Sequence, residues 1–250
     1  MASLIGAVEV DSSQPKVFMS HSSRPAYLAP LRFPALTAWY DRVIAVTTRE
    51  SVWRERVVHL LALEAGERVL DIGCGTGSLS MRIGAVAPAA FIMGIDMDEK
   101  ALAIARGKFL RASSGMRLHR GLAQHLPFAS EKFDVVVSSL FFHHLRSTEK
   151  RDVLREARRV LKPAGRLVIA DWGMPTGPFS RAAFLAVQVL DGFETTRDSV
   201  TGAFPHMIGE AGFDAIREAE PLHTPLGVMR FWRANVANRF ETRRAAPGAR

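Results

Sequence analysis

A run of closely spaced glycines, preceded by an acid, is the part of this 250-residue sequence best suited to hold a ligand. It reads DIGCGTG at residues 71–77, between a short apolar segment at 68–72 and a helix expected near 78–86. Glycines allow a tight turn and close approach of the backbone to a ligand. A dinucleotide-binding turn follows G-x-G-x-x-G, but Ser78 falls in that pattern here, and Asp71 disfavours a pyrophosphate. The turn instead favours a ligand with a cationic amino acid end.

A second acid, Asp96, ends the next apolar segment, at 91–96. An acid at the end of a second strand suits hydrogen bonds to both hydroxyls of a ribose. Each feature alone has a plainer explanation, because a glycine turn is usually only a turn and Asp96 could be a helix-flanking cap. Together and in this order, Asp71, the glycine turn and Asp96 predict a nucleoside ligand without phosphates and with a charged amino acid tail.

The segments around the turn alternate between apolar runs typical of strands and helical patterns. Strands are expected at 68–72, 91–96, 117–121, 133–139 and 166–171. Helices are expected at 78–86, from an Asp98 N-cap to about 112, and at 148–161, where Pro163 and Gly165 stop the last one. Strands this apolar are buried on both faces, as in a parallel α/β sheet with helices on both sides.

Four stretches of the chain resemble the class I S-adenosylmethionine-dependent methyltransferases. They are VLDIGCGTG from 69, GIDMDEKAL from 94, LPFASEKFDVVVSSLFFHHL from 126 and EARRVLKPAGRLVIAD from 156. The likeness covers about 67–172 and is greatest to the ubiquinone/menaquinone-type branch and its small-molecule relatives, whose N-terminal helices the segment 40–53 resembles more loosely. It implies S-adenosylmethionine as cofactor. It also implies a Rossmann-like, doubly wound sheet of seven strands, mostly parallel with the last antiparallel.

The resemblance also implies which residues surround the cofactor: Tyr40, Asp71, Gly73, Cys74, Gly75, Thr76, Gly77, Asp96, Met97, Leu122, Ala123, Gln124 and Ser139. Residues of the glycine turn would hold the methionine end, Asp96 the ribose, and Met97 would pack on the adenine. The segment 122–124 would line the adenine edge, and Ser139 would face the cofactor. The family often has Asp or Asn at the position of Leu122, so backbone groups or Gln124 would have to supply that hydrogen bond.

The remaining segments complete a single domain at 36–240. We expect an irregular arm at 1–35, cap helices at 36–63, a cofactor-binding core at 64–172, a lid and C-terminal strands at 173–240, and a disordered tail at 241–250. Within the lid part, helical patterns cover 179–193 and 200–211, and strands are expected at 213–220 and 228–234.

Methyl transfer from a sulfonium is a direct displacement with a neutral leaving group, so alignment and exclusion of water are the main tasks. A base is needed only if the acceptor loses a proton. His143 and His144 follow the fourth strand, and either could be that base, although His144 could instead be structural. Asp171 ends the fifth strand, where it could orient an acceptor or cap the loop. Quinone-modifying members often carry Arg-Asn at the histidine pair, which argues against a quinone precursor as acceptor.

Aromatic side chains are the candidates for an acceptor pocket: Phe141, Phe142, Trp172 and Phe184. On the lid helix, one face is expected to carry Phe179, Phe184, Val187, Leu190 and Phe193, as core or as pocket lining. An apolar lining favours an apolar or aromatic small molecule as acceptor. The sequence therefore predicts O-, N- or C-methylation of such a molecule by in-line displacement.

Other functions leave weaker signs. Enzymes that methylate base amino groups commonly show [ND]-P-P-[YFW] after strand four, where this chain has SSLFFHHL, and the single cysteine, Cys74, lies in the cofactor turn. A phospholipid N-methyltransferase stays open, because positive charge favours anionic surfaces. So does an inactive cofactor-binding module, although the intact Asp71, glycines and Asp96 argue against it. Ser78 disfavours a nicotinamide oxidoreductase.

Composition limits the partners. The net charge is +8, but no run of five basic residues occurs, and the densest group lies in the tail: Arg239, Arg243, Arg244 and Arg250. We therefore expect no nucleic acid partner. No apolar run reaches about 18 residues, so no membrane insertion is expected. One cysteine excludes an internal disulfide and a multi-cysteine metal site, and no metal is expected. Without a signal peptide pattern the protein is expected in the cytoplasm, with a homodimer as one option.

Overall fold

The computed structural model describes residues 49–112 and 114–237. The arm expected at 1–35, the first part of the expected cap with Tyr40, and the tail expected at 241–250 lie outside the described residues.

Seven strands of the described chain form one sheet in the order β3-β2-β1-β4-β5-β7-β6. Their bounds are β1 Arg68–Ile72, β2 Phe91–Asp96, β3 Arg117–Arg120, β4 Phe133–Ser139, β5 Leu161–Trp172, β6 Phe213–Thr224 and β7 Gly227–Val236. Strands β1 to β5 pair in parallel, and β7 runs antiparallel to both β5 and β6. The predicted seven-stranded, mostly parallel sheet with an antiparallel last strand is confirmed.

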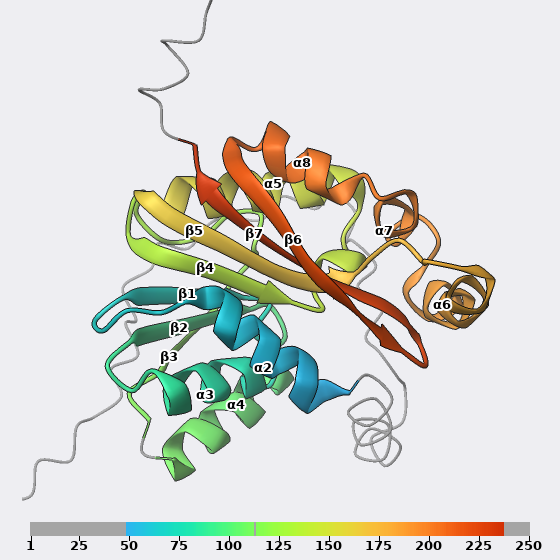
Figure 1. Cartoon of the computed structure of the whole chain (residues 1–250). Coiled ribbons are helices and arrows are strands. Elements are labelled where there is room, and N and C mark those ends of the chain that lie inside the picture. The colour runs from blue at the N-terminus through green and yellow to red at the C-terminus, as the bar shows by residue number, and fades with distance from the viewer. Residues whose placement is uncertain (1–48, 113, 238–250) are drawn as a thin grey trace, which may run out of the picture. The chain divides into compact units, whose positions relative to one another are not determined.

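Helices cover both faces of the sheet, as a doubly wound fold requires (Figure 1). The helices are α2 Glu50–Leu61, α3 Ser78–Val86, α4 Glu99–Arg111, α5 Ser147–Val160, α6 Pro178–Asp191, α7 Arg197–Thr201 and α8 Phe204–Glu210, with a short 3₁₀ turn η1 at Phe142–His144. Helices α2, α3 and α4 lie on one face, and α5 and α8 lie on the other. Each face has its own apolar core, one including Trp53 and Ile83, the other including Leu154 and Phe204.

Strand β5 begins earlier than the sequence predicts. The expected helix to 161 ends at Val160, and the chain passes directly into β5, whose first residue Leu161 pairs with Phe133. An irregularity in the ladder between Phe133 and Val135 accommodates the proline and glycine at 163 and 165, which locally signal a stop. Pairing across the sheet therefore overrides these local signals.

The helix expected at 200–211 is two helices. Gly202 adopts a left-handed φ of 72° and separates α7 from α8, which carries Pro205 in its first turn. The last two strands are also longer than expected. Edge strand β6 continues past Pro221 through a register shift between Ala219 and Leu222, which an edge strand tolerates because one side of it needs no ladder partner.

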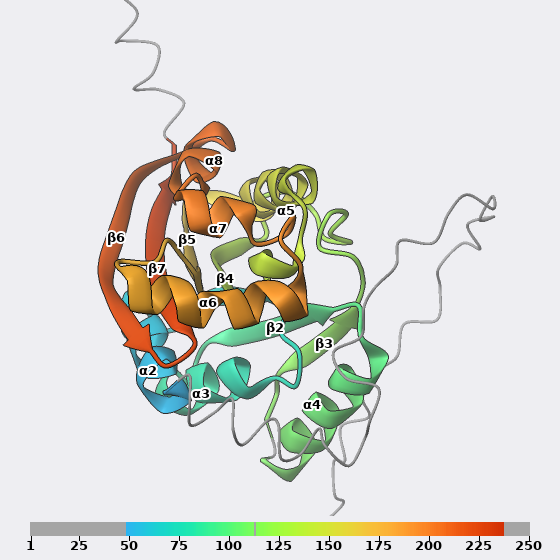
Figure 2. The same cartoon turned by 90° about the vertical axis from the view of Figure 1, so that its right-hand side faces the viewer.

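The parallel strands end at one edge of the sheet, which Figure 2 faces. Helix α6 lies at this end of the sheet, in contact with β7. The segments that follow β1, β2 and β4 also lie here, so ligand-binding residues from distant parts of the chain meet at this edge. None of the helices described here is long and apolar enough to cross a membrane.

Candidate cofactor and acceptor site

The glycine turn between β1 and α3 is held against the end of β2. The backbone N–H groups of Gly73 and Cys74 both donate to the carbonyl of Ile95, at 2.9 and 3.1 Å. A Cβ on Gly73 would lie 2.4 Å from the ring of Phe141, so this glycine lets the ring pack on the turn. Gly75 has a φ of 51°, and a Cβ there would meet nothing within 4 Å. The turn therefore presents open space at Gly75.

Asp71 is fully buried at the end region of β1. Ser80 on α3 donates its hydroxyl to Oδ2 of Asp71 at 2.6 Å, whereas Oδ1 has no hydrogen-bond partner among the described residues. Burial, and then the charge of Asp96, raise the pKa of Asp71 to about 7 against the opposing effects of Ser80 and Arg54. A buried carboxylate oxygen without a donor is suited to accept a hydrogen bond from a cationic ligand group.

Asp96 connects β2 to the turn. Its Oδ2 accepts the backbone N–H of Gly75 at 2.8 Å, and its Oδ1 accepts the backbone N–H of Asp98 at 2.8 Å. A carboxylate oxygen has two lone pairs, so each oxygen can still accept a second donor such as a ribose hydroxyl. Asp98 caps α4 as predicted, accepting from the backbone N–H groups of Lys100 and Ala101. Asp96 therefore shapes the turn as well as facing the expected ligand.

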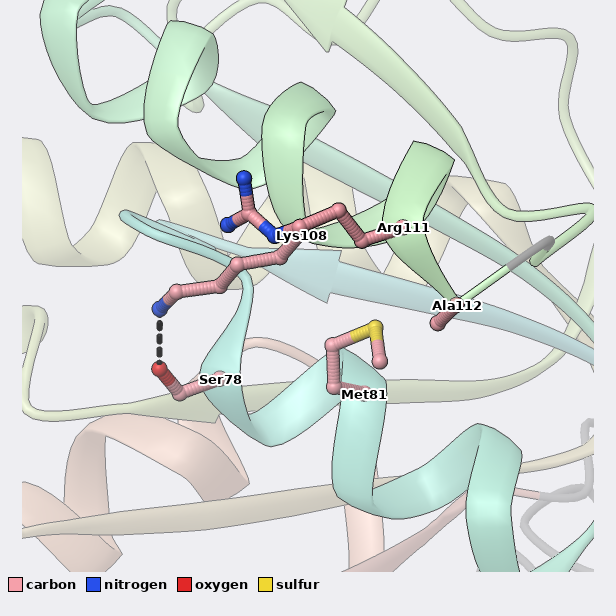
Figure 3. Close-up of a pocket in the computed structure, with 5 residues that line it drawn as sticks. All are labelled: Ser78, Met81, Lys108, Arg111 and Ala112. Carbon is pink, nitrogen blue, oxygen red and sulfur yellow. Dashed lines mark hydrogen bonds between the residues drawn. The ribbon is translucent and has the colours of Figure 1, made fainter.

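Two side chains of the turn point away from the expected ligand. Cys74 is buried, and its sulfur lies 2.7 Å from where a Cβ on Gly94 would be, so it packs on β2. Lys108 on α4 donates to the hydroxyls of Thr76 and Ser78, at 3.0 and 2.8 Å. Figure 3 shows this lysine in an open groove of about 420 Å³ between α3 and α4, lined also by Met81, Arg111 and Ala112. The backbone of Thr76, rather than its side chain, remains for a ligand at the sheet edge.

The residues expected at the adenine lie beyond the ends of β2 and β3. Met97 and Leu122 are exposed by 42% and 48%, which leaves apolar surface for a flat ring. Ala123 is buried and Gln124 is half-buried. Ser139, the last residue of β4, is half-buried at the same edge.

Asp171 near the end of β5 holds the loop after β4. Its Oδ2 accepts the backbone N–H groups of Phe141 and Phe142 at 3.1 and 2.7 Å. Its Oδ1 accepts the backbone N–H of Trp172 and meets Nδ1 of His143, both at 2.7 Å. Burial raises the pKa of Asp171, but the charge and hydrogen bond of His143 outweigh this and bring it below its usual value. Asp171 is therefore an ionised anchor for His143.

The two histidines of η1 differ in their surroundings. His143 is buried, whereas His144 keeps solvent exposure, and their ring centroids lie 3.9 Å apart. Desolvation, and then the charge of His143, lower the pKa of His144. His143 is thus the histidine with a fixed ring and a buried carboxylate partner, an arrangement that sets the tautomer of an imidazole.

The candidate aromatic residues divide into two groups. Phe141 packs on the glycine turn, and Trp172 lies edge-on to Phe184 of α6, with ring centroids 6.0 Å apart. Phe142 instead points into the core, where its ring centroid is 5.0 Å from that of Phe204. Phe141, Trp172 and Phe184 therefore lie near the turn or under α6, and Phe142 supports the loop from below.

The expected apolar stripe on the lid helix is wrong in part. Phe184 and Val187 are buried under α6, but Phe179 and Phe193 are exposed by 90% and 59%, and the side chain of Leu190 lies outside the described residues. Phe179 stands at the first turn of α6 and Phe193 beyond its end, where they do not follow the face that packs on Trp172.

Comparisons with known proteins agree with this geometry. A family model described as a methyltransferase domain matches residues 69–165. The chain is 31% identical over 186 residues to the ubiquinone/menaquinone biosynthesis C-methyltransferase UbiE of Cereibacter sphaeroides, a match that covers 66% of this chain and 74% of that relative. The chain belongs to the class I S-adenosylmethionine-dependent methyltransferases.

Two further likenesses fit this assignment. This methyltransferase is 32% identical over 154 residues to the demethylmenaquinone methyltransferase of Lactobacillus johnsonii, with 58% of this chain and 61% of that relative covered. The match thus spans about three fifths of that relative's length. A crystal structure of an S-adenosylmethionine-dependent methyltransferase from Aquifex aeolicus shares the fold, with a TM-score of 0.56, 20% identity, and 74% and 89% of the two chains covered.

The methyltransferase has residues that suit the cofactor of its family. The unpartnered Oδ1 of Asp71 suits an ammonium group, and the open space at Gly75 suits a ligand lying on the turn. Asp96 retains lone pairs toward a ribose. Among the described residues, no group of three or more His, Cys, Asp or Glu side chains could hold a metal ion.

Sequence reasoning missed two side chains of this methyltransferase site. Ser80 lies three residues after the last glycine of the turn, on the face of α3 that turns back to β1, and a helical projection from Gly77 could have indicated it. Arg54 follows the buried Trp53 on α2, and its charge acts on Asp71. Only the packing of α2 against the sheet reveals that proximity.

Proposed function

We propose that this chain transfers a methyl group from S-adenosylmethionine to an apolar or aromatic small molecule whose reacting O–H or C–H group gives up a proton. The observation that carries this proposal is the hydrogen bond between Nδ1 of His143 and Oδ1 of Asp171, at 2.7 Å. An acceptor that is already a neutral nucleophile has no use for a base, whereas a phenol or an acidic carbon does.

The buried pair supplies that base. Because the ionised Asp171 accepts from Nδ1–H, the imidazole of His143 carries its basic lone pair on Nε2. Nε2 takes the proton of the acceptor as the acceptor atom forms its bond to the methyl carbon, and Asp171 stabilises the resulting imidazolium. When bound, S-adenosylmethionine supplies the methyl group on a sulfonium, whose C–S bond breaks with both electrons going to sulfur.

Apolar walls support the choice of acceptor. Phe141 on the glycine turn and Trp172 at the end of β5 flank the loop that carries His143, and Phe184 of α6 backs Trp172. Such a lining favours flat apolar ligands and keeps water from the displacement. The relatives named for C-methylation in ubiquinone and menaquinone biosynthesis are consistent with an aromatic acceptor. The histidine pair at 143–144, where quinone-modifying members often carry Arg-Asn, favours another aromatic compound over a quinone precursor.

The test measures release of S-adenosylhomocysteine across a panel of phenols, quinols, amines and phospholipids. We expect turnover with a phenol or quinol, and a loss of roughly 10²–10⁴-fold in kcat for His143→Asn with unchanged cofactor affinity. His206→Asn, which changes an exposed histidine on α8, is the matched control. Turnover restricted to amines or phospholipids would contradict the proposal, as would wild-type activity in the His143→Asn variant.

A further inference from the structure

Two buried side chains of opposite charge beside the glycine turn each have a polar atom without a hydrogen bond. These atoms are Nε of Arg54, on α2, and Oδ1 of Asp71, on β1, and neither has a partner among the described residues. A buried polar atom without a partner is unfavourable, more so in a charged group. That two such atoms of opposite charge occur together points to a ligand that carries both charges.

The guanidinium of Arg54 is held from its own helix. Trp53 anchors α2 in the core that also contains Val69 and Leu79, and the guanidinium carbon of Arg54 lies 4.9 Å from the centroid of the Trp53 ring. Nη1 of Arg54 forms an ion pair with Glu50, one turn earlier. These contacts fix the plane of the guanidinium and leave its Nε edge without a partner among the described residues.

Arg54 and Asp71 act on each other without direct pairing. The charge of each moves the pKa of the other, and burial lowers the pKa of Arg54 to about 10 although Asp71 opposes that change. Within the described residues, however, Arg54 pairs with Glu50 and Asp71 bonds to Ser80. The unpaired edge of the cation and the unpaired oxygen of the anion are therefore close in space and separately available.

We propose that Arg54 and Asp71 form a clamp for a zwitterion, in which Nε of Arg54 donates to the α-carboxylate of the cofactor and Oδ1 of Asp71 accepts from its α-ammonium. An amino acid end carries these two groups on one carbon, so one ligand satisfies both atoms. The clamp rests on the proposed use of S-adenosylmethionine. It assigns a cofactor-binding residue to α2, outside the glycine turn and the strand ends.

The competing explanation is that Arg54 only offsets the charge of Asp71. The two explanations differ in what happens to a ligand without a carboxylate. Decarboxylated S-adenosylmethionine keeps the amine and the sulfonium but lacks the carboxylate. If Arg54 binds the carboxylate, its loss weakens S-adenosylmethionine alone. If Arg54 only stabilises ionised Asp71, its loss weakens both ligands alike.

Isothermal titration of both ligands into wild type, Arg54→Gln and Arg56→Gln tests this. Arg56 is the matched control, since it is on the same helix but lies over Phe231 and donates to the carbonyl of Glu220. We expect Arg54→Gln to weaken S-adenosylmethionine roughly 10- to 100-fold, as for a lost hydrogen bond between charged groups. It should change decarboxylated S-adenosylmethionine by less than about threefold, and Arg56→Gln should change neither by more.

Equal weakening of both ligands by Arg54→Gln, or no weakening of either, would overturn the clamp. If Arg54→Gln fails to fold, wild type alone still decides, because the clamp requires it to prefer S-adenosylmethionine over the decarboxylated ligand at least about tenfold. Equal wild-type affinities would then overturn the clamp. A wild type that binds neither ligand would instead refute the proposed function itself.

Discussion

The carboxylate of Asp171 meets Nδ1 of His143 at 2.7 Å while it also accepts three backbone N–H groups, those of residues 141, 142 and 172. One buried side chain at the end of β5 thus determines both the shape of the loop after β4 and the orientation of its histidine. The positioning of His143 and the folding of the loop are therefore coupled.

Asp171→Asn should reduce both activity and stability. An asparagine offers one oxygen where four N–H donors converge, and its own NH₂ group then faces a donor. Leaving buried donors unsatisfied costs about 1–3 kcal/mol, and loss of the anion beside a catalytic histidine lowers kcat by up to roughly 10⁴-fold in a Ser-His-Asp triad. Urea unfolding and release of S-adenosylhomocysteine measure the two effects. Asp214→Asn, at an exposed position of β6, is the control, and a loss no greater than that of the control would contradict the anchor role.

Gly75→Ala should weaken the cofactor without a matching loss of stability. Gly75 and Gly66 both have a left-handed φ, of 51° and 82°, and a Cβ on either meets nothing within 4 Å. Alanine at each therefore carries a similar backbone strain of about 1 kcal/mol. Only at Gly75 does the new methyl group enter space that the cofactor needs. We expect similar falls in Tm for the two variants, and at least about tenfold weaker titration of S-adenosylmethionine for Gly75→Ala alone. Equal affinities would show that the space at Gly75 is not used.

The parts of the fold that local signals determine could be predicted closely. Strand β1, helix α3, strand β2 and strand β4 have the expected bounds, because continuous apolar runs, the glycine turn and the Asp98 cap act within a few residues. The start of β5 and the full length of β6 could not be predicted. There the deciding contact is a strand partner far along the chain, such as Phe133 for Leu161.

The candidate site follows the same division. The acids at 71 and 96 and the glycines between them are visible in the sequence because family spacing places them at strand ends. The pairing of His143 with Asp171 joins positions 28 residues apart, and the sequence leaves open which histidine faces the acid. The nearness of Arg54 to Asp71 depends on how α2 packs, which no local pattern encodes.

Lys150→Met should destabilise the protein strongly. Lys150 on α5 is 1% exposed, and its ammonium donates to Asp198 of α7 at 2.8 Å and to the carbonyl of Thr195 at 2.6 Å. Removing one member of a buried pair costs roughly 3–5 kcal/mol, because the other charge is left without its partner. Urea unfolding should show a loss of this order, partly recovered in Lys150→Met/Asp198→Asn.

Lys162→Met is the matched control for that prediction. Lys162 pairs with Asp134 at 2.6 Å, but its side chain is 42% exposed. Exposed pairs contribute about 0–1 kcal/mol, so this variant should lose little stability. Comparable losses for the two lysines would contradict the view that the α5–α7 contact depends on a buried charge.

The raised pKa of Asp71 gives cofactor binding a pH dependence of known sign. Its pKa rises from 3.8 to about 7 on folding, so the folded protein without ligand binds the extra proton between these values. The Asp71 contribution to stability therefore falls as pH rises through this window. Binding the ammonium group requires the ionised form, so affinity for S-adenosylmethionine should rise by up to about tenfold per unit from about pH 5.5 to about pH 7. Asp71→Asn cannot ionise and should bind weakly with little pH dependence over this range. Titrations of both proteins at each pH separate this effect from the ligand's own ionisation, and parallel profiles would contradict the assignment of Asp71 to the ammonium group.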